Sequence, residues 1–257
     1  MELVSLQIID DYVALIRFNR PEAKNAISRE LLTQFAGCIK SVGKSKARVL
    51  VIQGSGDSFS AGADLKERSG WSESDVVAFL NEFRNCLIDL ENLSIPSIAL
   101  VNGFAFGGGL ELALSCDLIY ASENAIVGLT ETKLGIIPGA GGTQRLAQRV
   151  GLQTAKEWIF RGKKLSSHEA YQKGLFLEIF PAESCELEVL KIAKDIAESA
   201  PIAVRAAKKA IKGSMSLEIE SGLDWERICY FDTIRTKDRM EALLAFKEKR
   251  KPNFLGE

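Results

Sequence analysis

Three consecutive glycines, Gly107–Gly109, open directly into a short apolar run at Leu110–Leu114. An apolar segment typical of a strand, Ile95–Val101, leads into these glycines, and another, Leu118–Ala121, follows the run. Glycine has no Cβ, so a glycine turn lets the backbone approach a ligand closely. The unpaired N–H groups at the start of a helix favour negative charge. The segment therefore predicts a strand, a glycine turn and a helix whose first amides can polarise a carbonyl oxygen.

A second glycine turn lies upstream, in the segment Ser60–Glu67 with the sequence SAGADLKE. A single turn of this kind is more often a tight connection between a strand and a helix, with no ligand. Two such turns in one chain, together with acidic residues that follow the strands, favour a binding or catalytic site.

Two glutamates stand out from the many that are expected to be solvated. Glu111 lies within the apolar run that follows the three glycines, and burial there would raise the pKa of its carboxyl toward the working pH. Glu131 follows twenty residues later, between Gly128 and Gly135, in a stretch whose only other charge is Lys133. A carboxyl group with a raised pKa is suited to proton transfer.

Composition excludes several classes of protein. The 257 residues carry 33 basic and 34 acidic side chains, so the net charge of −1 gives no overall field that would recruit nucleic acid or an anionic membrane. Five dispersed cysteines without a CxxC pair indicate reduced core thiols rather than a disulfide framework. The single histidine, His168, lies in an S-x-x-E capping box and is expected in the first turn of a surface helix.

The N-terminal segment alternates as strands do, has no signal-peptide pattern, and no run of about 18 apolar residues follows. We therefore expect a protein that does not associate with membranes. A cytoplasmic location is expected if the source is bacterial, and a mitochondrial one if a transit peptide has been removed.

Strands and helices alternate along the first part of the chain, which favours an α/β fold. Val4–Ile8 and Val13–Phe18 predict a hairpin, Ser28 and Ser72 predict helix starts, and Val49–Ile52 predicts a buried strand. From about Ala200 only helices are expected. Their predicted ranges are Ala203–Ile211, Glu218–Tyr230 and Asp238–Lys249. We therefore divide the chain into a core at residues 1–199, which carries the site, and a helical region at residues 200–257.

Three motifs, SAGADLKE, NGFAFGGGLELALSCD and GLTETKLGIIPGAGGTQRL, resemble in order and spacing the enoyl-CoA hydratase/isomerase (crotonase) superfamily. The opening FNRPEAKNAIS and the closing AFKEKRKPNF also fit, so the resemblance covers nearly the whole chain. The segments GADLKER, GLTETKL and TKDRMEALLAFKEKR are most similar to the methylglutaconyl-CoA hydratase-like subgroup. The resemblance implies a spiral of repeated ββα units and a C-terminal helical region that assembles homotrimers, which can pair into a hexamer.

The resemblance also implies roles for individual residues. The backbone N–H groups of Ala63 and Gly108 would form an oxyanion hole for the thioester oxygen of an acyl-CoA. Glu111 and Glu131 would together hold one water and add it across the 2,3 double bond of a 2-enoyl-CoA. We assign Glu131 as the proton donor to Cα and Glu111 as the group that activates the water. The remaining residues implied to contact the substrate or its CoA are Lys24, Ala26, Ala61, Asp64, Leu65, Lys66, Phe246 and Lys249.

The presence of both acids favours hydration over double-bond isomerisation, because isomerases of this superfamily generally keep only one acid at these places. No metal and no cofactor is expected, since CoA is part of the substrate. The acyl chain stays open: a straight short chain from fatty-acid metabolism and a branched chain from leucine degradation both fit.

RNA binding is the competing function, because the same subgroup includes members reported to bind AU-rich RNA. That function needs a basic helix. The helix expected after Ser28 carries only Arg29 and Lys40 as cations, with Lys44 and Lys46 just beyond it, so RNA is not an expected partner. A family member without catalytic activity is disfavoured by the intact pair Glu111 and Glu131.

Overall fold

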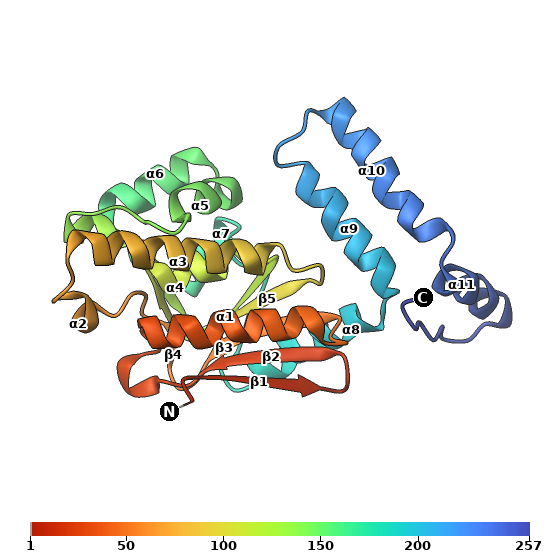
Figure 1. The fold of residues 1–257 in the computed structure, drawn as a ribbon, viewed down its shortest axis with the longest axis horizontal. Helices are drawn as coiled ribbons and strands as arrows, with labels where there is room; N and C mark the ends of the chain where they lie inside the picture. The colour runs from red at the N-terminus through yellow and green to blue at the C-terminus, as the bar shows by residue number, and fades with distance from the viewer. Residues whose placement is uncertain (1) are drawn as a thin grey trace.

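The computed structural model describes residues 2–257, which form a body of two sheets with covering helices and a helical extension at the C-terminus (Figure 1). Six strands form the larger sheet in the order β1-β2-β3-β5-β7-β10. The hairpin β1 (Val4–Ile9) and β2 (Val13–Phe18) is antiparallel, as predicted, and the other neighbours in this sheet are parallel. The predicted α/β class is confirmed.

Strands come in consecutive pairs that divide between the two sheets. The larger sheet takes β3 (Val49–Gly54), β5 (Ser97–Val101) and β7 (Leu118–Ser122). The strand after each joins the smaller sheet, of order β4-β6-β8-β9: these are β4 (Ser58–Ser60), β6 (Phe104–Phe106) and β8 (Ile126–Gly128), with β9 (Leu165–Ser166) at the edge. A helix follows each pair, and this is the repeated ββα unit that the resemblance implied.

Helices cover both faces of the larger sheet. On one face, apolar side chains of α1 (Arg29–Lys44) and α3 (Glu73–Glu91), including Leu31, Phe35 and Phe83, join the main core. On the other face, α8 (Cys185–Glu198) packs a second cluster, which includes Val189 and Ala193, against β2, β3 and β5. The centre of the sheet is covered on both faces, and this explains why every residue of β3 and β5 is buried and most of them are apolar.

Local capping signals in the sequence are confirmed. The Ser28 hydroxyl accepts from the Leu31 N–H at the start of α1. Ser72 and Asp75 form a capping box at the start of α3. The Ser166 box starts α7 (Ser167–Gln172) and leaves His168 exposed in its first turn, as predicted.

The remaining elements complete the chain between the strands and at the C-terminus. They are η1 (Pro21–Ala23), α2 (Leu65–Arg68), α4 (Gly108–Leu114), η2 (Glu131–Leu134), α5 (Gly142–Val150), α6 (Leu152–Arg161), β10 (Ile179–Phe180), α9 (Pro201–Gly213), α10 (Ile219–Ile234) and α11 (Lys237–Glu248). No helix among residues 2–257 is both long and apolar enough to cross a membrane.

The last three helices extend away from the two-sheet body, with α9 and α10 as an antiparallel pair (Figure 1). Each lies where the sequence predicted a helix. Many of their large apolar side chains are exposed to solvent, and these include Ile211, Leu223, Ile228, Tyr230 and Phe231. The division of the chain at residue 200 stays a prediction.

Candidate functional site

The glycine turn before α4 has a backbone that requires glycine. Gly107 has φ 50° and ψ −124°, a conformation that L side chains rarely adopt. Its N–H donates to the Gly128 oxygen at 2.9 Å, and its own oxygen accepts from the Glu111 N–H at 2.9 Å. The turn therefore joins β8 to the first turn of α4 and brings Glu111 close to the end of β8.

The upstream turn is held against the chain before α1. The Ile27 N–H donates to the Gly62 oxygen at 2.7 Å, and the Asp64 N–H donates to the Ile27 oxygen at 3.1 Å, which makes a parallel bridge between Ile27 and Ala63. In such a bridge the central residue uses neither its own N–H nor its own oxygen. The Ala63 N–H therefore points away from Ile27.

The two turns meet where the backbone amides of Ala63 and Gly108 lie. A Cβ placed on Gly62 would lie 3.1 Å from the Gly108 nitrogen, and one placed on Gly108 would lie 3.7 Å from the Ala63 nitrogen. Within residues 2–257, neither the Ala63 N–H nor the Gly108 N–H has a hydrogen-bond acceptor. Two unpaired backbone donors side by side can receive one oxygen that carries partial negative charge.

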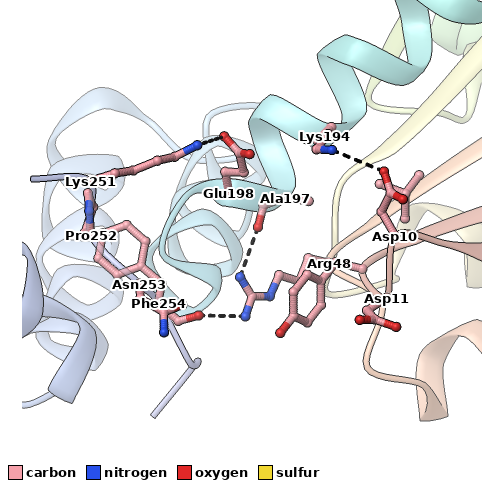
Figure 2. A pocket seen from close by; sticks show the side chains of 12 residues that line it. Asp10, Asp11, Arg48, Lys194, Ala197, Glu198, Lys251, Pro252, Asn253 and Phe254 are labelled. Atoms are coloured by element: carbon pink, nitrogen blue, oxygen red, sulfur yellow. Dashed lines mark hydrogen bonds and ion pairs between the residues drawn. The ribbon is translucent and has the colours of Figure 1, made fainter.

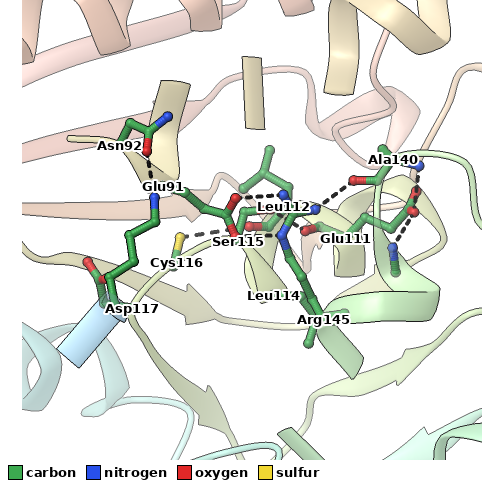
Figure 3. A network of polar contacts seen from close by, with 12 residues as sticks. Glu91, Asn92, Glu111, Leu112, Leu114, Ser115, Cys116, Asp117, Ala140 and Arg145 are labelled. Atoms are coloured by element: carbon green, nitrogen blue, oxygen red, sulfur yellow. Dashed lines mark hydrogen bonds and ion pairs between the residues drawn. The ribbon is translucent and has the colours of Figure 1, made fainter. Parts of the chain in front are cut away.

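Glu111 is buried, and one of its carboxylate oxygens is fixed by two amides. Oε1 accepts from the Ala140 N–H at 2.7 Å and from the Gly142 N–H at 2.8 Å (Figure 3). Burial raises the pKa of the Glu111 carboxyl, while these amides and the nearby Arg145 oppose the rise. The carboxylate thus has a fixed orientation and donors that stabilise its charge.

Glu131 is the first residue of η2 and is 9 % exposed. Its Oε2 is buried and has no hydrogen-bond partner within residues 2–257. Burial, with a contribution from the charge of Glu111, raises the pKa of the Glu131 carboxyl to about 7. A Cβ on Gly107 would lie 3.2 Å from its Oε1, so this carboxyl packs against the turn that carries Gly108.

Six of the predicted substrate contacts lie around the Ala63 turn. The Ala61 N–H donates to the Lys24 oxygen at 2.9 Å, and this bond joins the segment containing Ala26 to the segment that ends in α2. Leu65 is 57 % exposed at the start of α2, next to Lys66, which is also exposed. The Lys24 ammonium lies 4.5 Å from the centre of the Phe104 ring.

The Asp64 side chain has a local structural role. Its Oδ1 accepts from the Lys66 and Glu67 N–H groups at 3.0 and 3.2 Å and so caps α2. Its Oδ2 pairs with the Arg20 guanidinium at 2.6 Å. These interactions hold the turn that carries Ala63.

Phe246 and Lys249 are not brought to this group within one chain. Both lie at the end of α11, and Figure 1 shows α11 and α2 at opposite ends of the molecule. Phe246 is 87 % exposed, so its ring is free for a contact outside the chain.

A cavity of about 540 Å³ lies away from the two glutamates, between the β1–β2 loop, the end of α8 and the C-terminal tail (Figure 2). The Arg48 guanidinium spans it: it donates to the Ala197 oxygen at 3.1 Å and to the Phe254 oxygen at 2.8 Å, and it stacks 3.7 Å from the centre of the Tyr12 ring. None of the predicted site residues lines this cavity. Arg48 ties the tail that follows α11 to the body.

Sequence reasoning missed two parts of the site. The amides of Ala140 and Gly142 hold Glu111, although their segment was used only as a motif. Phe83 of α3, which the sequence did not connect with the site, lies at the Gly108 turn: a Cβ on Gly108 would be 2.9 Å from its Cε1. The glycine-rich sequence GAGG was the one available signal for the first part.

Comparison with known proteins identifies the family. Residues 9–257 match the sequence pattern of the enoyl-CoA hydratase/isomerase family. The chain is 45 % identical to an enoyl-CoA isomerase/hydratase of Mycosarcoma maydis, with 93 % of this chain and 90 % of that protein covered. It is 41 % identical to the mitochondrial methylglutaconyl-CoA hydratase of Mus musculus, with 95 % and 80 % covered. The crystal structure of an enoyl-CoA hydratase from Bacillus anthracis superposes with a TM-score of 0.98 at 42 % identity, with 99 % and 100 % covered.

The chain belongs to the enoyl-CoA hydratase/isomerase family. The predicted superfamily, its fold and the prediction of an enzyme of the enoyl-CoA hydratase type are confirmed.

Proposed function

We propose that this protein adds water across the 2,3 double bond of a short or branched 2-enoyl-CoA thioester. The thioester oxygen lies between the N–H groups of Ala63 and Gly108. These donors are stronger partners for the enolate that forms during addition than for the neutral carbonyl, so they lower the barrier rather than only binding the substrate.

The two carboxyl groups divide the proton transfers. Ionised Glu111, oriented by the Ala140 and Gly142 amides, takes a proton from water as the water oxygen bonds to Cβ. The π electrons of the double bond move into the thioester enolate. Neutral Glu131 then donates its proton to Cα as the enolate collapses, and the product is a 3-hydroxyacyl-CoA.

One observation carries this proposal: the buried, unpartnered Oε2 of Glu131 beside the turn of Gly107 and Gly108. Buried polar atoms normally have partners, so an orphaned carboxyl oxygen in a site indicates a place for substrate or water. The raised pKa keeps a proton available there near neutral pH.

The test is a panel of 2-enoyl-CoA thioesters, with the loss of enoyl absorbance as the readout. Straight-chain crotonyl-CoA and branched methylglutaconyl-CoA are the two essential members, because relatives at similar identity carry both kinds of name. Absorbance loss with a water-adduct product supports hydration. A product with the same mass and a moved double bond would instead assign isomerase activity, which the family name also covers.

The rate of hydration is expected to fall as pH rises through about 7. Glu131 must carry a proton to act as the acid, and the pKa of its carboxyl is raised to about 7. The protonated form dominates below that pH and is lost above it. The measurement is kcat/KM for the preferred thioester between pH 5 and pH 9. A rate that keeps rising tenfold per pH unit across this range would contradict the assignment of Glu131 as the acid.

We also propose that the protein assembles as a trimer, which can pair into a hexamer, through α9–α11. The exposed apolar side chains of these helices favour packing against another subunit. Because α11 and α2 lie at opposite ends of one chain, residues of α11 would complete the CoA site of a neighbouring subunit. Phe246 of one subunit would then stack on the adenine of CoA bound to another, and Lys249 would meet its phosphates.

Truncation after Ala200 is therefore expected to give a monomer with weakened CoA affinity. A milder change, Phe246→Ala, should raise KM for enoyl-CoA by about tenfold and leave kcat nearly unchanged, because it removes a binding contact far from the reacting atoms. Light scattering and steady-state kinetics check both variants. A fully active monomer at assay concentration would contradict the assembly.

A further inference from the structure

The orientation of Glu111 depends on a turn that carries no catalytic side chain. Its Oε1 is held by the amides of Ala140 and Gly142, so any shift of the segment between them moves the carboxylate. Gly141 in the middle of this turn has φ +108°, a left-handed conformation that side chains disfavour. The turn therefore needs a support that keeps it in this shape.

Arg145, one turn into α5, supplies that support. Its Nη1 donates to the Ala140 oxygen at 2.7 Å. The N–H of the same residue donates to Glu111, so Ala140 is held from both sides. Its Nε and Nη2 donate to Glu91 Oε1 and Oε2 at 2.6 and 2.8 Å (Figure 3). A Cβ on Gly141 would collide with Nη1, so the guanidinium packs directly against the turn.

Glu91 fixes this guanidinium from another part of the fold. It is the last residue of α3, and its pair with Arg145 is bidentate, the strongest common geometry for such ions. The Arg145 side chain is 13 % exposed and that of Glu91 is 30 % exposed, so solvent screens this pair less than it screens a pair at the surface. The chain of contacts runs from α3 through the guanidinium to the turn, and from the turn to Glu111.

We propose that Arg145 is a positioning residue which, anchored by Glu91, holds the turn at 139–142 so that its amides orient Glu111 for reaction with water. The inference rests on the proposed hydratase function. Arg145 touches neither substrate nor the reacting atoms. Its positive charge also opposes the rise in the pKa of the Glu111 carboxyl, which supports the same role.

Arg149 provides a matched control on the same helix. It is also half-buried, but it donates to backbone oxygens at and just after the end of α4, those of Leu114, Cys116 and Asp117, and within residues 2–257 it makes no hydrogen bond to the 139–142 turn. Arg149→Met should lower the melting temperature and leave kcat close to that of the wild type. It measures what the loss of an arginine from α5 does by itself.

The experiment is a double-mutant cycle with Arg145→Met and Glu91→Gln, measured with the enoyl-CoA that the wild-type enzyme hydrates best. Arg145→Met should lower kcat by about 30- to 100-fold with KM within about threefold, because a displacement of about 1 Å costs that much. Glu91→Gln should lower kcat by about fivefold, and the double variant should be no worse than Arg145→Met, since Glu91 acts only through Arg145.

The outcomes separate this inference from the proposed function. If the wild type hydrates no thioester, the function fails, and a crystal structure of Arg145→Met still tests the positioning: Glu111 Oε1 should lose its contact with the Gly142 N–H. If the wild type is active and Arg145→Met keeps its kcat with that contact intact, the inference is overturned. Should Arg145→Met fail to fold, Glu91→Gln carries the test, and an unchanged kcat for it overturns the proposal.

Discussion

Glu131→Gln is expected to reduce the rate of enoyl-CoA hydration by about 10²–10⁴ while the thioester still binds. Glutamine keeps the size and the polarity of the side chain, but it cannot deliver the proton to Cα. The thioester is held by the amides of Ala63 and Gly108 and by contacts to CoA, which the change leaves in place. The measurements are kcat from the loss of enoyl absorbance and the dissociation constant of a saturated acyl-CoA, which should stay within about threefold of the wild type.

Glu111→Gln should give a loss of similar size, because its carboxylate activates the same water. The double variant should be little worse than either single one, since two groups that act on one step act as a unit. Glu186→Gln is the control: this glutamate on α8 pairs with Arg17 at the surface and should retain full activity. Near wild-type turnover in either Glu111→Gln or Glu131→Gln would refute the two-carboxylate mechanism.

Gly108→Val is expected to lower kcat/KM by about 10²–10³ or more, the cost of losing a donor to the oxyanion. Its Cβ would lie 2.9 Å from Phe83 Cε1 and 3.7 Å from the Ala63 nitrogen, so the side chain occupies the space in front of both amides. The thioester oxygen then cannot reach them, although the helix that begins at this residue can still form.

Gly37→Val is the matched control for that prediction. Gly37 lies within α1, and a Cβ added there meets no atom within 4 Å. Both variants should give circular dichroism spectra close to the wild type, and only Gly108→Val should lose activity. Normal turnover by folded Gly108→Val would place the thioester oxygen somewhere else.

The elements with long periodic patterns were predictable from the sequence. The hairpin of β1 and β2, the faces of α1 and α3 and the caps at Ser28 and Ser72 all depend on local chemistry that a few neighbouring residues determine. The smaller sheet was not predicted as a sheet. Its strands have two or three residues, too short for an alternation to be recognised, and only their pairing across the ββα units gives them order.

The same distinction between local and tertiary features applies to the candidate site. The glycine turns and the carboxylates of Glu111 and Glu131 in their apolar surroundings can be recognised in the chain itself. The choice of Ala63 and Gly108 within those turns came from the resemblance to the family. The contacts that tune them are tertiary. Gly142 lies 31 residues from the carboxylate that it binds, and Arg145 lies 54 residues from Glu91. No local sequence pattern can therefore predict either contact.

The C-terminal helices show what a single chain leaves unexplained. Their apolar residues predicted helices correctly, but many of them face solvent, for example Ile219 and Phe231. Intrinsic periodicity cannot say whether an apolar face packs on its own body or on another subunit. The exposure therefore supports the proposed assembly and explains why the sequence alone did not place α11.

The incorporation of water oxygen into the product tests the central claim most directly. The wild-type enzyme is incubated with crotonyl-CoA or methylglutaconyl-CoA in water labelled with heavy oxygen, and the thioester product is analysed by mass spectrometry beside the same reaction with Glu131→Gln. Hydration predicts a 3-hydroxyacyl-CoA that carries one labelled oxygen, formed by the wild type and lost in the variant. A thioester whose double bond has moved without gaining labelled oxygen, or a labelled product formed equally fast by the variant, would contradict the account.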